Sequence, residues 1–221
     1  MKRRAALGLV PAIWLASTQA LAQASNGQAL IEAAARGDTA AVTRLLAQGA
    51  PVNARDSRGR NAVLAATQGG HTESARVLIA AGADINAQDD IQDSAFLLAG
   101  ARGHTEIVKL ALQARPDFKR LNRYGGTALI PACHYGHVET VRVLATSGID
   151  VNHVNRLGWT ALLEAVILGD GGARHVEIVR LLLAHGANPN IADRDGVTPL
   201  AHARRLGQAQ VATLIERGGG R

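Results

Sequence analysis

The stretch GHTESARVLIAAGADINA, residues 70–87, decides the fold because close copies of it recur along the chain. Copies begin at Gly37, Gly103 and Gly136, so that successive copies start 33 residues apart, and a further copy begins at His175. Similarity at a fixed period of this length predicts a chain of stacked structural repeats. In such a stack each repeat contacts only its neighbours, because no single repeat buries its apolar face alone.

A second shared phrase precedes these copies. It reads DSRGRNAVLAA from Asp56, NRYGGTALIPA from Asn122, NRLGWTALLEA from Asn155 and DRDGVTPLAHA from Asp193. Its first four residues are typical of a turn, with a Gly that tolerates positive φ. A polar residue that can cap a helix N-terminus follows, and these predicted caps are Asn61, Ser94, Thr127, Thr160 and Thr198. Each repeat should therefore contain a turn, a short apolar helix and a second helix that ends at a Gly.

Together the two phrases resemble the ankyrin repeat, and the resemblance covers nearly all of the chain after residue 22. It implies an all-α fold, a solenoid of about six helix-turn-helix units with β-turn or hairpin-like loops. We expect one ankyrin repeat domain, residues 23–221, whose units are 23–55, 56–88, 89–121, 122–154, 155–192 and 193–221. The terminal units should act as caps, since each has one face in water.

The first 22 residues belong to a different class of segment. Three cations at residues 2–4 precede an uncharged stretch, and the small residues Ala20 and Ala22 lie two apart. This pattern predicts a secretory signal peptide, residues 1–22, that is cleaved before Gln23. The alternative is a retained membrane anchor, but the strongly apolar part is shorter than the ~20 residues that a span needs.

Charge and cysteine content limit the location and the partners of the mature chain. Removing residues 1–22, with three cations and no anion, lowers the formal net charge from +6 to +3. Export and this small charge argue against nucleic-acid binding, although the Arg content is high. The single Cys133 permits no intramolecular disulfide. These features favour a periplasmic monomer of bacterial type, without stable membrane insertion after cleavage.

Two units depart from the repeat pattern. The third has Gln92 at the turn Gly position, and residues 115–118 (Arg-Pro-Asp-Phe) replace the Gly-Ala-Asp type sequence of other units. Irregular loops are therefore predicted in the third unit. The fifth unit inserts residues 170–174, where neighbouring glycines predict a mobile bulge between two helices. Two interpretations of this insertion are open: a binding loop, or an insertion without function, since loops of this size cost little free energy.

The histidines suggest a metal site at first sight, but their register argues against one. His71, His104, His137 and His175 occupy the same place in four repeats, at the start of the second helix. Residues that lie one per layer, ~10 Å apart, cannot converge on an ion whose ligands lie near 2 Å from it. We therefore expect a structural role, hydrogen bonding between neighbouring turns, and no metal or other cofactor.

No catalytic residues are predicted. Cys133 and His134 are adjacent on a helix, where consecutive side chains point about 100° apart, so they do not form a nucleophile and base. Cys133 aligns with small residues of other repeats and is interpreted as a packing position. The recurring Glu73, Glu106, Glu139 and Glu177 are interpreted as early-helix charges that favour the helix dipole.

The residues that do not repeat indicate where a partner binds. In ankyrin proteins the variable residues of the turn tips and the exposed side of the first helices usually form the partner surface. Carried onto this sequence, the rule selects Arg58, Arg60, Arg102, Arg123, Tyr124, His134, Tyr135, Arg156, Trp159 and Arg194. Tyr, Trp and Arg are favoured at binding hot spots. We expect Tyr124, Tyr135 and Trp159 to share one patch with a cationic rim that suits an acidic protein.

A simpler interpretation of this surface remains, in which arginines only keep the turns soluble and Trp159 covers a neighbouring helix. The resemblance itself implies a non-enzymatic scaffold that binds a partner protein on its concave face, around the third to fifth repeats. Exported bacterial ankyrin proteins of this kind are linked to peroxide defence, and others are immunity proteins that neutralise a toxin. An enzyme or metal protein would need a cluster of acidic, Cys or His residues outside the repeat register, and none is visible.

Overall fold

The computed structural model describes the backbone of residues 11–221 and the side chains of residues 23–221. The cations at residues 2–4 that suggested a signal peptide lie outside the described residues. Within residues 11–221 the chain forms twelve α-helices and no strand. They are α1 (Pro11–Ala35), α2 (Thr39–Ala47), α3 (Ala62–Gln68), α4 (Thr72–Ala80), α5 (Ala95–Arg102), α6 (Thr105–Gln113), α7 (Leu129–His134), α8 (Val138–Ala145), α9 (Ala161–Ile167), α10 (Ala173–Ala184), α11 (Pro199–Arg205) and α12 (Ala209–Arg217).

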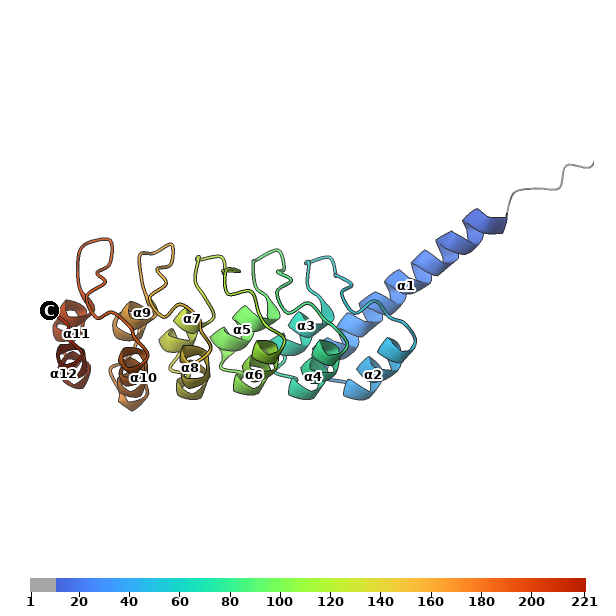
Figure 1. Cartoon of the computed structure of the whole chain (residues 1–221). Helices are drawn as coiled ribbons and strands as arrows, with labels where there is room; N and C mark the ends of the chain where they lie inside the picture. The colour runs from blue at the N-terminus through green and yellow to red at the C-terminus, as the bar shows by residue number, and fades with distance from the viewer. Residues whose placement is uncertain (1–10) are drawn as a thin grey trace, which may run out of the picture.

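The helices form six consecutive pairs that stack side by side, as the sequence predicted (Figure 1). Each odd-numbered helix packs on the next odd-numbered helix, and each even-numbered helix packs on the next even-numbered one. The stack therefore has two layers, and the turns that precede the first helices project on the same side (Figure 1). Because contacts are made between neighbours, the core is continuous along the stack.

Small residues allow the first helices to approach each other closely. Ala62, Ala95 and Ala161 open three of the first helices, Ala128 directly precedes α7, and all four are buried. At Gly100 a Cβ atom would lie 2.6 Å from the carbonyl oxygen of Ala128, which is too close for any side chain. Larger buried residues such as Leu78, Leu144 and Leu162 belong to the continuous hydrophobic core of the stack. Burial of one such side chain contributes about 1.5–3 kcal/mol to stability.

The recurring histidines connect neighbouring repeats, and the predicted structural role is confirmed for three of them. The Nε2 atom of His71 lies 3.1 Å from Ala35 O, and that of His137 lies 3.2 Å from Ala101 O. In the fifth repeat His175 Nε2 lies 3.0 Å from a carbonyl oxygen of α7. His104 differs, because its Nε2 is buried without a hydrogen-bond partner. In the last repeat Gln208 replaces the histidine and donates from Nε2 to Val166 O at 3.0 Å.

The loops of the third repeat are regular, so the expectation of irregular loops there was wrong. Gln92 adopts the positive φ of 62° that Gly residues adopt at this place in other turns. The Asp89 carboxylate holds the turn by accepting from the backbone N–H groups of Ile91 and Asp93 at 3.1 and 2.9 Å. Likewise Arg115, at φ 57°, takes the place of a helix-ending Gly. The hydrogen bonds of the loop thus impose its shape on residues that rarely adopt it.

The insertion of the fifth repeat lengthens both the loop between α9 and α10 and the helix that follows it. The loop covers residues 168–172, whereas the loop between α7 and α8 covers residues 135–137, and the mobility of the longer loop stays a prediction. Helix α10 has 12 residues, whereas α4 and α6 have 9. The loop before it is held by Asp170, whose Oδ1 accepts from Gly172 N at 2.9 Å and lies 2.7 Å from His175 Nδ1. Since α10 begins earlier, Glu177 is outside its first turn, and the expectation of an early-helix charge is wrong at this position.

Four of the five predicted helix caps are present. Asn61, Ser94, Thr160 and Thr198 each accept from a backbone N–H three residues later. Thr127 does not, because α7 begins only at Leu129 and its N-cap residue makes no side-chain hydrogen bond. The cause is the residue four positions after Thr127, which is Pro131. In the other four repeats the backbone carbonyl oxygen of the cap residue accepts from the N–H of the residue four positions later. Pro131 has no N–H and cannot donate this hydrogen bond.

Candidate functional site: the central groove

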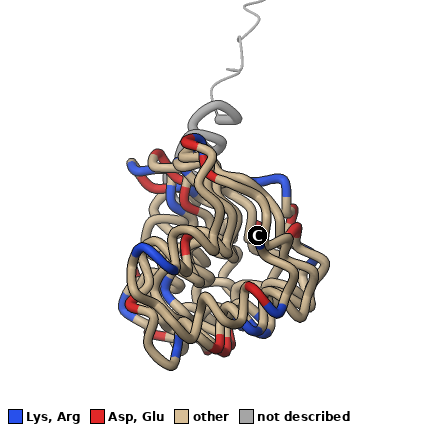
Figure 2. The backbone as a smooth tube through the Cα atoms, turned by 90° about the vertical axis from the view of Figure 1, so that its left-hand side faces the viewer, with Lys and Arg blue, Asp and Glu red and all other residues tan. Residues whose placement is uncertain are grey.

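The turn tips are connected by arginine side chains. Arg156 donates from Nη1 to Arg123 O at 3.0 Å, and Arg123 donates from Nη1 to Ile91 O at 3.5 Å. Arg194 donates in the same way to Arg156 O, and Arg55 donates to Gln88 O in the following turn. These exposed guanidinium groups therefore fasten one turn to its neighbour. Viewed along the stack, basic and acidic residues are mixed at the turn tips and do not form a face of one sign (Figure 2).

A depression of about 900 Å³ lies between the turn tips and the first helices of the third to fifth repeats. We name it the central groove. Its wall and floor come from α5, α7, α9 and the turns before α7 and α9. The residues used below are Asp93, Arg102, Arg123, Tyr124, His134, Tyr135, Asn155, Leu157, Glu164 and Leu168.

Half of the sequence-predicted partner residues line this groove. Five of them do so, namely Arg102, Arg123, Tyr124, His134 and Tyr135. The other five lie outside the lining, namely Arg58, Arg60, Arg156, Trp159 and Arg194. Trp159 is half-buried and is not among the groove-lining residues, which include the two tyrosines, so the patch shared by all three aromatic residues stays a prediction. Whether the outer residues bind a partner stays a prediction.

Arg60 has a clear structural role. It pairs with Asp56 at 2.7 Å, and only 14% of its side chain and 7% of the Asp56 side chain are exposed. It also donates from Nη1 to Gln68 Oε1 at 2.6 Å. Hydrogen bonds from Arg60 contribute to the lowered pKa of the Asp56 carboxyl, against the opposing effect of burial. This arginine is thus held within its own repeat.

Two rows of exposed apolar side chains flank the groove. One row lies on the turn tips and contains Ile91, Tyr124 and Leu157, which occupy the same position in three successive repeats. The other row lies at the ends of the first helices and contains Tyr135, Leu168 and Leu206. Each of these six side chains is at least 42% exposed. Exposed apolar side chains that gather on one surface are typical of interaction sites.

Both tyrosines are oriented by a neighbouring polar group. The Tyr135 ring stacks on His134, with ring centroids 4.3 Å apart and an angle of 12° between the planes. The Arg123 guanidinium carbon lies 5.2 Å from the centroid of the Tyr124 ring. Arg123 also lies 3.6 Å from Asp93, whose carboxyl pKa is raised by burial despite this cation. Each aromatic ring thus contacts a neighbouring side chain while about half of it is exposed to solvent.

A carboxyl group, that of Glu164 on α9, lines the same groove. Its side chain is 9% exposed, its Oε1 accepts from Asn155 Nδ2 at 3.2 Å, and its Oε2 lies 3.7 Å from His134 Nδ1. Burial raises the pKa of Glu164 from 4.5 to about 7. Burial also lowers the pKa of His134. Cys133 is fully buried on α7, and burial together with the nearby Glu164 raises the pKa of its thiol.

Sequence reasoning missed Glu164 and the two exposed leucines of the groove, Leu157 and Leu168. Glu164 stands four residues after its helix cap, where the three preceding repeats have Ala65, Leu98 and Pro131. A charged residue at a position that is otherwise apolar was the available signal. Leu157 and Leu168 gave a weaker signal, since exposed leucines are common on protein surfaces.

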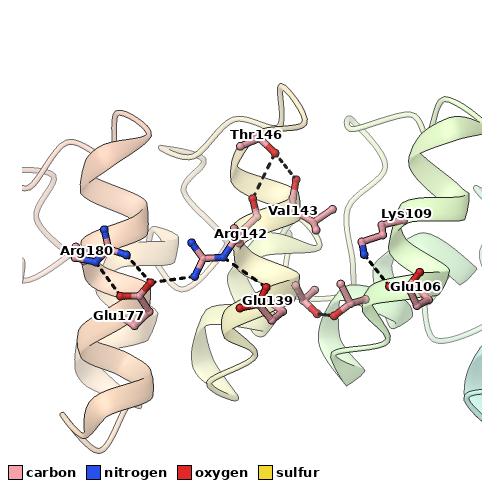
Figure 3. A network of polar contacts seen from close by, with 10 residues as sticks. Glu106, Lys109, Glu139, Arg142, Val143, Thr146, Glu177 and Arg180 are labelled. Carbon is pink, nitrogen blue, oxygen red and sulfur yellow. Dashed lines mark hydrogen bonds and ion pairs between the residues drawn. The ribbon is translucent and has the colours of Figure 1, made fainter.

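The opposite face of the stack carries ion pairs. On α6, α8 and α10 a Glu pairs with the basic residue three positions later, and Arg142 also reaches Glu177 of the next repeat at 3.0 Å (Figure 3). The Glu177 pKa is lowered mainly by its hydrogen bond with Arg180. Exposed pairs of this kind contribute little to stability, about 0–1 kcal/mol each.

Among the described residues no three His, Cys, Asp or Glu side chains are grouped as metal ligands would be.

None of the helices in residues 11–221 combines the length and the apolarity needed to cross a membrane.

The chain matches a known family along nearly its whole length. The family described as "Ankyrin repeats (3 copies)" matches residues 8–89, 90–155 and 152–219. No curated protein gave a significant match. An ankyrin repeat domain from Acinetobacter baumannii AYE is 51% identical, with 87% of this chain and 98% of that chain covered and a TM-score of 0.84.

Two further solved structures are similar. The ankyrin repeat protein EF0377 is 39% identical, with 86% of this chain and 98% of that chain covered and a TM-score of 0.83. The ankyrin repeat domain of Bcl-3, a member of the IkappaB protein family, is 26% identical, with 87% and 86% covered and a TM-score of 0.77. The shared repeat phrases, the stacked helix pairs and these matches show that the chain belongs to the ankyrin repeat family.

Proposed function

We propose that this protein is an exported, non-catalytic scaffold that binds a partner protein in the central groove. Ankyrin repeats mediate protein-protein interaction, and the proposal assigns that interaction to one surface. The observation that carries it is the pair of tyrosines in the groove, Tyr124 and Tyr135, which are 52% and 55% exposed. Large aromatic side chains at the centre of a concave surface are typical binding hot spots.

The charges of the groove rim support rapid association with a partner that has acidic groups. Arg102 and Arg123 lie at the α5 side of the groove, and Asp93 pairs with Arg123. The two arginines therefore outnumber the single aspartate at this side of the groove. Such a rim raises the association rate at low salt and contributes less to affinity than the aromatic centre does.

Export to the periplasm is part of the proposal. Its basis is the composition of residues 1–22, and the burial pattern of α1 is compatible with it. Residues 23–26 are not buried, and the first buried residue after them is Gly27. Cleavage before Gln23 would therefore leave every described core side chain in the mature chain. Peroxide defence and toxin neutralisation would both use the same groove, and the identity of the partner distinguishes them.

Partner capture from a periplasmic extract tests the proposed surface. We expect the chain to retain a specific protein, and the variant with Tyr124→Ala and Tyr135→Ala to lose it, since each hot-spot aromatic contributes about 2 kcal/mol or more. Lys109→Ala, on the outer face of α6, is the matched control. Full capture by a folded double variant would place the binding site outside the central groove.

A further inference from the structure

We infer that the central groove binds an extended segment of the partner and that one basic side chain of this segment, Lys or Arg, pairs with the Glu164 carboxylate. This inference rests on the proposed function and specifies the chemistry of the partner. It follows from the position of Glu164, from the absence of a Lys or Arg paired with it among residues 23–221 and from the apolar rows beside it.

Glu164 is held in place but its carboxylate is not fully satisfied. Asn155 donates to Oε1 at 3.2 Å and thereby fixes the orientation of the group. Oε2 is 3.7 Å from His134 Nδ1, which is longer than a hydrogen bond. The side chain is 9% exposed, and the exposed part lines the groove. A donor that enters the groove thus has one carboxylate oxygen available to it.

The described residues provide no permanent cation for this carboxylate. Among the described side chains, no Lys or Arg nitrogen lies within 4.0 Å of a Glu164 carboxylate oxygen. The imidazole of His134 is the only ion-pair partner of Glu164 among them. Burial lowers the pKa of His134 and so disfavours the charged form of that ring. An anion that is buried without a counter-ion is unfavourable. A cation supplied by a ligand would remove this cost, and this difference favours a basic ligand over a neutral one.

The apolar rows suit the rest of such a ligand. Leu157 on the turn row and Leu168 on the helix row line the groove together with Glu164. A Lys or Arg side chain has an aliphatic stem that packs on apolar surface while its charged end reaches a polar group. Tyr124 and Tyr135 belong to the same two rows one repeat earlier. Adjacent residues of an extended segment would contact them.

The location of the opposite charges makes the site selective. Arg102 and Arg123 together exceed the charge of Asp93 at the α5 side of the groove and so disfavour a basic side chain there, whereas Glu164 lines the groove from α9. A basic residue is therefore favoured at one place in the groove. Selectivity of this kind depends on repulsion at wrong positions as well as on attraction at the right one.

Selection of a random dodecapeptide library on the full chain tests the inference. We expect selected peptides to share one Lys or Arg next to apolar residues, and to lose binding to the Tyr124→Ala, Tyr135→Ala variant. On the isosteric Glu164→Gln variant the preference for a basic residue should disappear. Lys109→Ala again serves as the control, and circular dichroism checks that each variant is folded.

A double-mutant cycle on one selected lysine peptide gives the decisive measurement. Replacing its lysine by norleucine, which keeps the stem, should weaken binding to the wild-type chain at least about tenfold, as close charge pairs at interfaces do. The same replacement should have little effect on Glu164→Gln, because the pair is already absent. Equal losses on both proteins, peptides without a basic residue, or no groove-dependent peptide would overturn the inference. If partner capture still depended on the tyrosines, the proposed function would stand without it.

Discussion

The Glu164 carboxyl binds its proton more tightly in the folded chain than in the unfolded chain, since burial raises its pKa from 4.5 to about 7. The stability that this proton contributes is fully present below pH 4.5. It is lost as the pH rises through about 7, because ionisation then occurs inside the fold. A shift of this size corresponds to about 3 kcal/mol.

Glu164→Gln should therefore remove a pH-dependent cost of folding. We expect wild type and variant to have similar free energies of unfolding at pH 4. At pH 8 the variant should be more stable by about 3 kcal/mol, because Gln cannot ionise. Urea unfolding at both pH values measures the difference, with the exposed Glu73→Gln as control. Parallel pH profiles of wild type and Glu164→Gln would contradict the buried ionisation.

For single residues, the sequence indicated which side chains line the groove rim, but it did not indicate which side chains are buried or lie close together. The tyrosines and arginines of the groove rim were found because they vary between repeats. Glu164 was overlooked because attention to recurring acids and histidines gave no weight to a single charged residue on a short apolar helix. Its proximity to His134 arises from the packing of α9 on α7, which no local pattern encodes.

At the scale of single elements, helix caps determine where the first helices begin. Thr160 caps α9 through its side-chain oxygen, which accepts from Leu163 N at 3.2 Å. Thr127 occupies the same position in its repeat, yet its Oγ1 is buried and has no hydrogen-bond partner in the described part of the chain. The two threonines thus differ in energetic role although they are equivalent in sequence.

The substitutions Thr160→Val and Thr127→Val should separate these roles. Thr160→Val removes a cap and should lower stability by about 1 kcal/mol. Thr127→Val removes an unsatisfied buried hydroxyl of similar volume, and should leave stability unchanged or raise it. Thermal and urea unfolding of both variants give the comparison. Equal destabilisation by the two substitutions would show that Thr127 caps α7 in solution.

The elements also show where pattern-based prediction fails. Repeat register placed the helices and four caps correctly, since these depend on residues within one unit. Pro131 changed the start of α7, although the proline itself was visible in the sequence. The third-repeat loops were predicted to be irregular from Gln92 and Arg115, but hydrogen bonds hold both residues in the shape of the other repeats.

At the scale of the whole molecule, the first repeat depends on only part of α1. Leu30 and Ile31 are almost fully buried in the core, whereas Gln23, Ala24 and Ser25 are exposed. The extended start of α1 points away from the stack (Figure 1). The stack should therefore fold without the segment that we expect to be cleaved.

Two truncations test this division. A chain that begins at Gln23 should melt within about 2 °C of the full chain, the shift that less than about 1 kcal/mol produces in a domain of this size. A chain that begins at Arg36 loses Leu30 and Ile31 and should be strongly destabilised. N-terminal sequencing of the exported protein locates the cleavage point. A large loss of stability in the Gln23 chain would mean that residues 11–22 are part of the folded unit.

The burial of Cys133 has a practical consequence for fluorescent labelling of the chain. This residue is the single cysteine of the chain, and its fully buried thiol with a raised pKa is a poor nucleophile toward alkylating reagents. A second cysteine placed at the exposed Ala173, at the start of α10, would consequently be labelled selectively by a maleimide dye. The chain thus accepts a single fluorescent reporter without the removal of its own cysteine.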